Sequence, residues 1–163
     1  MGELVLSLVA IVLHEAGHIA AAKVVGAPVR SFSIKAVGAS LRFDFCGISF
    51  GREALVHLGG PLTGGASAII ALLIFGERGR FFCGISTVLS AVNLLPIKGF
   101  DGGGVLSCVL ASFCLPDRAE RISSAVSFSF LMVLWAAVLW IELRVGANLS
   151  LLAFVLFFML KVE

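Results

Sequence analysis

Long apolar segments separated by short polar ones dominate the pattern of hydrophobic and polar positions in this chain. A helix needs about 20 apolar residues to cross the hydrocarbon of a bilayer. The apolar segments cover residues 3–24, 53–75, 80–113, 122–143 and 147–160. The third of them is interrupted by Pro96 and Gly99, which break a helix. The pattern therefore predicts about five transmembrane helices, one of them interrupted.

Residues 29–50 follow another pattern. In the stretches SFSIKAV and LRFDF apolar and polar residues alternate, and Gly38 lies between the two stretches. Alternation with period two is typical of strands. The predicted fold is therefore an all-α polytopic membrane protein with a small β-hairpin between its first two helices. We expect one membrane-embedded domain over residues 1–163, with a core at 3–115 and two additional helices at 116–163.

Composition supports a membrane protein and excludes a nucleic-acid-binding one. The chain is 60% hydrophobic and only 13% charged, whereas soluble domains carry about 25% charged residues. Its net charge of +2 comes without any basic run that could follow a phosphate backbone. Glu3 is the only early charge, so the first apolar segment lacks the basic start of a signal peptide and is expected to be retained.

Basic residues near the helix ends predict the orientation. The loop after the first helix is rich in them, with Lys23, Arg30, Lys35, Arg42 and Arg52. Cytoplasmic loops carry such an excess, so we expect this loop and the C-terminus inside and the N-terminus outside a cell membrane. His18 precedes Lys23 by five residues, about 8 Å along a helix, which places it toward the cytoplasmic side.

His14, Glu15 and His18 are ionisable groups inside the first apolar segment. Histidines one turn apart lie on the same helix face, about 6 Å apart along the axis, and can share one Zn²⁺. The glutamate lies beside such a metal, where it can take a proton from bound water. The alternative is a pair of histidines that only pack between helices. Because ionisable groups within membrane segments are costly and usually functional, we favour the metal site.

A catalytic zinc needs a third protein ligand. Asp101 is the only carboxylate of the interrupted segment, and it follows the break as the expected N-cap of a short helix. Glu53 is the alternative ligand. We expect His57 to have an interfacial or packing role, and we assign neither disulfides nor metal binding to the four cysteines.

Three motifs resemble the site-2 protease family of intramembrane zinc metalloproteases. They are HEAGH in the first apolar segment, GGPLTGG in the second and NLLPIKGFDGG in the third. The last matches the family pattern NxxPxxxxDG through Asn93, Pro96, Asp101 and Gly102. With a compact hairpin and no inserted PDZ domain, the chain is most similar to the bacterial sporulation subgroup that processes a pro-sigma factor. It departs from that subgroup in that we expect no CBS domain, which the subgroup often carries.

The resemblance implies a role for each matching residue. His14, His18 and Asp101 would bind one Zn²⁺ per chain, and Glu15 would act as general base and then as general acid. Asn93 would donate a hydrogen bond to the substrate or to the developing oxyanion. The hairpin would guide the substrate, a membrane-associated or single-span protein such as a pro-sigma or anti-sigma factor. A regulatory membrane partner is also expected.

The chain departs from the family pattern at one motif. The pattern GPxxN finds Gly60 and Pro61, but Gly64 occupies the asparagine position. The glycines around these residues and those of KGFDGGG leave two interpretations open, a backbone-lined water channel or close helix packing. Two other functions also remain, a zinc transporter and an inactive relative that acts as a binding module. Transport predicts further polar residues along the later helices, which carry few.

Overall fold

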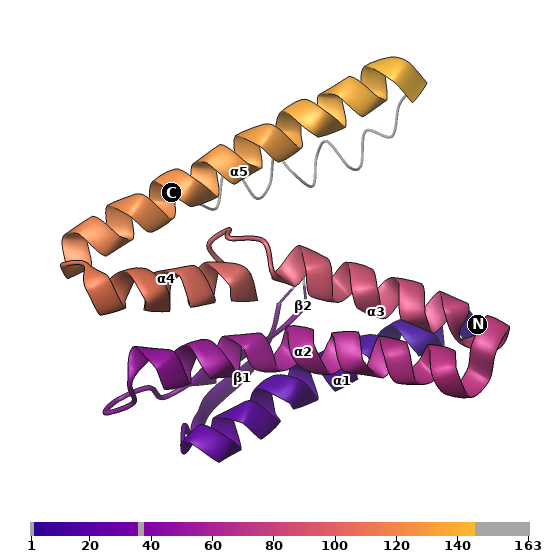
Figure 1. Cartoon of the computed structure of the whole chain (residues 1–163), viewed down its shortest axis with the longest axis horizontal. Coiled ribbons are helices and arrows are strands. Elements are labelled where there is room, and N and C mark those ends of the chain that lie inside the picture. Colours follow the sequence, from indigo (N-terminus) through magenta and orange to yellow (C-terminus); the bar gives the residue numbers. More distant parts are fainter. Residues whose placement is uncertain (1, 36–37, 146–163) are drawn as a thin grey trace. The chain divides into compact units, whose positions relative to one another are not determined.

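The computed structural model describes residues 2–35 and 38–145, so the predicted helix at 147–160 lies outside the described residues. Helices dominate this part of the chain (Figure 1). The elements in order are α1 (Gly2–Val25), β1 (Val29–Lys35), β2 (Gly38–Phe43), α2 (Phe50–Phe75), η1 (Gly76–Gly79), α3 (Arg80–Asn93), α4 (Asp101–Phe113) and α5 (Pro116–Val145).

Three helical stretches are long and apolar enough to cross a membrane. They are Gly2–Val25, Phe50–Asn93 and Pro116–Glu142, the second of which contains α2, η1 and α3. The helix α4 is apolar but shorter. These stretches support a mostly helical membrane protein, as the sequence predicts. The number of crossings stays a prediction.

The predicted break in the third apolar segment is confirmed, but the predicted helix cap is wrong by one residue. The helix α3 ends at Asn93 and α4 begins at Asp101. Phe100 is the N-cap, because its backbone is extended and its carbonyl accepts the hydrogen bond of the Gly104 N–H at 3.1 Å. Asp101 is therefore the first helical residue.

The predicted hairpin is also confirmed. The strands β1 and β2 pair antiparallel from Lys35 opposite Gly38 to Val29 opposite Phe43. Beside the hairpin, Ala22 near the end of α1 and Val56 near the start of α2 belong to one buried cluster. The hairpin thus connects the first two helices, as the alternating pattern predicts.

The chain forms two compact units, Met1–Leu94 and Leu95–Glu163. In the first unit α1, α2 and α3 pack against one another. Gly59 of α2 packs closely against α1, since a Cβ on it would lie 2.5 Å from the Gly17 carbonyl oxygen and 2.8 Å from the Cβ of Ala21. Close packing is therefore the role of Gly59, one of the glycines for which two interpretations were open.

In the second unit, α5 holds the loop that precedes α4. Ile97 is fully buried, and its neighbour Lys98 donates its backbone N–H to the Ser127 hydroxyl at 3.0 Å. The Lys98 ammonium pairs with Glu120 and donates to the Ser124 hydroxyl. This loop conformation fixes the point at which α4 starts, and therefore where its first residue lies within this unit.

Candidate metal centre

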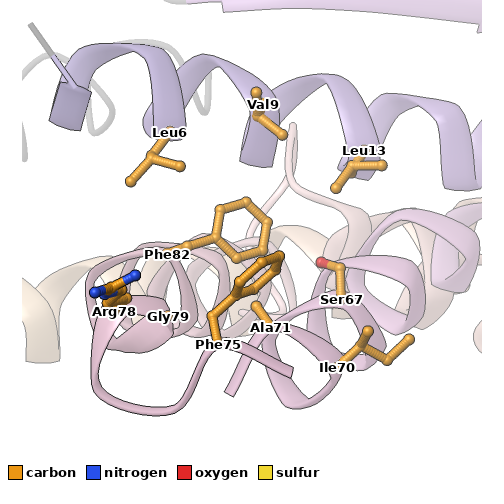
Figure 2. A pocket seen from close by; sticks show the side chains of 10 residues that line it. All are labelled: Leu6, Val9, Leu13, Ser67, Ile70, Ala71, Phe75, Arg78, Gly79 and Phe82. Carbon is orange, nitrogen blue, oxygen red and sulfur yellow. The ribbon is translucent and has the colours of Figure 1, made fainter. Parts of the chain in front are cut away.

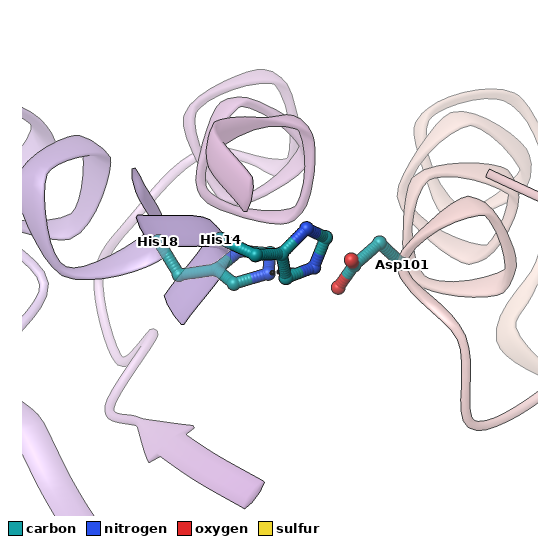
Figure 3. A group of neighbouring side chains, drawn as sticks. All are labelled: His14, His18 and Asp101. Atoms are coloured by element: carbon teal, nitrogen blue, oxygen red, sulfur yellow. Dashed lines mark hydrogen bonds between the residues drawn. The ribbon is translucent and has the colours of Figure 1, made fainter. Parts of the chain in front are cut away.

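His14 and His18 form a buried pair on one face of α1. Their side chains are 4% and 7% exposed. The two Nε2 atoms lie 3.3 Å apart, and the ring planes meet at 78° (Figure 3). In a tetrahedral site with Zn–N bonds of about 2.0–2.1 Å, two nitrogen ligands lie about 3.3–3.4 Å apart. The separation of the two Nε2 atoms therefore fits zinc coordination.

A backbone carbonyl orients the His18 ring. The His18 Nδ1 lies 2.8 Å from the carbonyl oxygen of Val56 on α2. Because a carbonyl only accepts hydrogen bonds, Nδ1 must carry the proton, and the neutral ring then has its lone pair on Nε2. Metal-binding histidines almost always donate their second ring N–H in this way. The contact therefore presets the tautomer that a metal ligand needs.

Gly60 of α2 makes room in front of both Nε2 atoms. A Cβ at this position would lie 2.7 Å from the His14 Nε2 and closer still to the His18 Nε2. Any side chain here would fill the space that a metal would occupy. The glycine, the nitrogen separation and the preset tautomer together fit a bound Zn²⁺.

Figure 3 draws the three side chains of the predicted metal set, two from α1 and one from the first turn of α4. The structure brings His14 and His18 together within the first unit. Asp101 belongs to the second unit and is half-buried. Its participation as a ligand remains a prediction.

The remaining predicted residues differ in their surroundings. Glu15 follows His14 directly on α1 and is half-buried. Asn93 is the last residue of α3, and its Nδ2 donates to the Leu89 carbonyl of the same helix at 2.9 Å. For the predicted substrate contact, this amide would have to leave Leu89.

Glu53 and His57 lie one turn apart at the start of α2, and both are half-buried. The His57 ring packs against Phe45, with 6.0 Å between the ring centroids. This contact supports the packing role that the sequence predicts for His57. Glu53 stays the predicted alternative to Asp101 as the third metal ligand.

The sequence did not indicate that the Ser90 hydroxyl lies near His14. Gly64 of α2 faces the Ser90 hydroxyl of α3, and a Cβ on Gly64 would lie 3.7 Å from the His14 Nδ1. Ser90 is 7% exposed. The spacing of Ser86 and Ser90, one helical turn apart, was the only signal in the sequence.

An apolar groove of about 450 Å³ lies between the N-terminal half of α1 and the helices α2 and α3 (Figure 2). Leu6, Leu13 and Phe82 line it, and its only polar lining residues are Ser67 and Arg78. No His, Cys, Asp or Glu side chain lines this groove. The candidate chemistry therefore lies at the histidines and not in this groove.

Comparison with solved structures identifies a protein of the same fold. No protein-family model and no curated protein matches the chain. The structure of a site-2 protease from Methanocaldococcus jannaschii superposes with a TM-score of 0.72, covering 98% of this chain and 74% of that one. The sequence identity is 23%, so the likeness shows a shared fold.

Proposed function

We propose that this protein is an intramembrane zinc endopeptidase. One observation carries the proposal. A membrane-length helix holds two buried histidines whose Nε2 atoms are 3.3 Å apart, with Glu15 between them in sequence. The fold shared with a site-2 protease supports the same conclusion.

The proposed zinc ligands are His14, His18 and Asp101. Zinc, when bound there, would lower the pKa of a coordinated water to about 7 and polarise the peptide carbonyl. Glu15 takes the proton from the attacking water and returns it to the leaving amine. Asn93 exchanges its hydrogen bond to Leu89 for one to the substrate backbone.

The proposed substrate is a membrane-associated or single-span protein, and a pro-sigma factor is the first class to test. An intact helix shields its carbonyls, so the scissile segment must unwind. Within the described residues each strand of the hairpin pairs only with the other, which leaves an outer edge on both. An unwound segment can add to such an edge as a further strand. The proposed orientation places the centre toward the cytoplasm.

The test compares the wild type with Glu15→Gln by co-expression with a tagged single-span reporter that carries the membrane-associated segment of a pro-sigma factor. We expect the variant to keep one zinc per chain and to lose cleavage by about 10²–10⁴-fold, the usual effect of removing a general base. Glu3→Gln, the same charge change in the first turn of the same helix, should cleave like the wild type.

Three outcomes would count against the proposal. Cleavage by Glu15→Gln at the wild-type rate would remove Glu15 from the mechanism. A wild-type protein purified without zinc, and unable to take it up, would remove the metal site. Zinc uptake into vesicles containing the protein, together with an uncleaved reporter, would favour the transporter instead.

A further inference from the structure

The space beside Gly64 is bordered by two helices other than its own. The Ser90 hydroxyl reaches it from α3, and the His14 Nδ1 lies beside it on α1. All three residues belong to the first unit and are buried. The His14 Nδ1, the ring nitrogen other than the one that faces His18, therefore lies near a serine hydroxyl.

Ser90 differs from most helical serines in this chain. Serines in helices commonly donate to a carbonyl one turn earlier, and Ser7, Ser112 and Ser129 do so at 2.8 to 2.9 Å. The Ser90 hydroxyl has no hydrogen-bond partner among the described residues, although it is buried. It lies against Gly64 of α2. A buried hydroxyl without a partner is destabilising, so a ligand for it is expected.

We propose that Ser90 is a positioning residue for His14, linked to its Nδ1 through one water molecule. The link rests on the metal-binding role proposed for His14. Ser90 makes no direct hydrogen bond to the ring, yet both polar atoms border the same position beside Gly64. One water spans polar atoms on the order of 5 Å apart. The Val56 carbonyl makes the corresponding contact to the His18 ring.

A hydroxyl and a water suit His14 because its ring has to change tautomer. When the 3.3 Å contact is a hydrogen bond in the metal-free protein, the His14 Nε2 donates it, because the Val56 carbonyl keeps the His18 proton on Nδ1. When His14 binds metal, that proton must move to Nδ1. The Nδ1 therefore accepts a hydrogen bond in one state and donates one in the other. A hydroxyl or a water serves both states, whereas a carbonyl serves only one.

Gly64 leaves room on α2 for the Ser90 hydroxyl of α3. A Cβ on residue 64 would overlap the Ser90 Oγ, so the hydroxyl takes the place of a side chain on α2. Two substitutions can therefore move the hydroxyl from one helix to the other. In the double variant Gly64→Ser with Ser90→Ala, the hydroxyl moves from α3 to α2 and stays beside the His14 Nδ1.

The experiment measures Zn²⁺ affinity of the metal-depleted full chain in detergent by competition with a chromophoric chelator. Ser90→Ala should bind Zn²⁺ about 10–100-fold more weakly, the usual cost of losing an outer-shell partner. The control is Ser86→Ala, which removes another buried hydroxyl one turn earlier on α3 and should bind like the wild type. The double variant should recover most of the loss, and Gly64→Ser alone should not bind normally.

Melting temperatures of the metal-depleted proteins separate positioning from folding. We expect Ser90→Ala and Ser86→Ala to melt alike, because neither hydroxyl has a protein partner in the described part of the chain. Equal Zn²⁺ affinity of the two single variants would overturn the role of Ser90, and so would a double variant as weak as Ser90→Ala. A wild type that binds no Zn²⁺ would instead overturn the proposed function itself.

Discussion

Replacing Gly60 by alanine should abolish metal binding while leaving the fold in place. The new methyl group would lie 2.7 Å from the His14 Nε2 and closer to the His18 Nε2. Zn²⁺ must approach both atoms to about 2.0–2.1 Å, so the methyl group and the metal compete for one position. To bind zinc, the variant would have to turn at least one histidine out of its present geometry.

The magnitude follows from two opposing effects. Alanine in place of glycine stabilises a helix by about 0.5–1 kcal/mol, and overpacking a buried position costs about 1–3 kcal/mol. The net destabilisation of the metal-depleted protein is therefore at most about 2.5 kcal/mol. The loss of Zn²⁺ affinity should exceed 100-fold, because losing an outer-shell partner alone costs about 10–100-fold.

Gly65 provides the matched control for Gly60. It is the same residue type on the same helix, five positions later, and a Cβ there would meet no atom within 4 Å. Gly65→Ala should keep wild-type Zn²⁺ affinity and melt slightly higher. Chelator competition and thermal unfolding of both variants give the comparison. Wild-type affinity in Gly60→Ala would refute the assignment of the metal to the space between the two Nε2 atoms.

Two further predictions concern the second unit. Asp101→Ala should lower the zinc content of the purified protein while Glu53→Ala leaves it unchanged, as measured by elemental analysis; the reverse result would make Glu53 the third ligand. Ser127→Ala removes the acceptor of the Lys98 N–H and should lower the free energy of unfolding by about 1–3 kcal/mol, whereas Ser129→Ala on the exposed side of α5 should have little effect. Equal stability of the two serine variants in chemical denaturation would show that this hydrogen bond does not hold the loop.

The sequence located the break before α4 but misplaced the cap by one residue. Pro96 and Gly99 lie in the loop that interrupts the apolar segment, and Gly99 has a φ of 95° that favours glycine. Sequence patterns give helix ends only to within a residue or two. The choice of Phe100 as cap depends on the extended backbone that follows a loop held by α5, and no local pattern contains that information.

The glycine-rich stretch of α2 shows a similar limit. From the sequence, packing and a water channel were equally good interpretations of its glycines. Gly59 packs against α1, Gly60 faces the two Nε2 atoms, and Gly64 faces Ser90. Which helix meets each glycine depends on the rotation of α2 about its axis. That rotation is set by contacts with α1 and α3, which lie far away in sequence.

The sequence by itself determined the long apolar helices, the hairpin and the alignment of His14 with His18. Each of these follows from the pattern of apolar and polar residues within one continuous segment. Only the tertiary structure decided what surrounds the histidines. The Val56 carbonyl, the space at Gly60 and the Ser90 hydroxyl reach them from α2 and α3. Their positions follow from how three helices pack side by side, and helix packing joins residues that no sequence period relates.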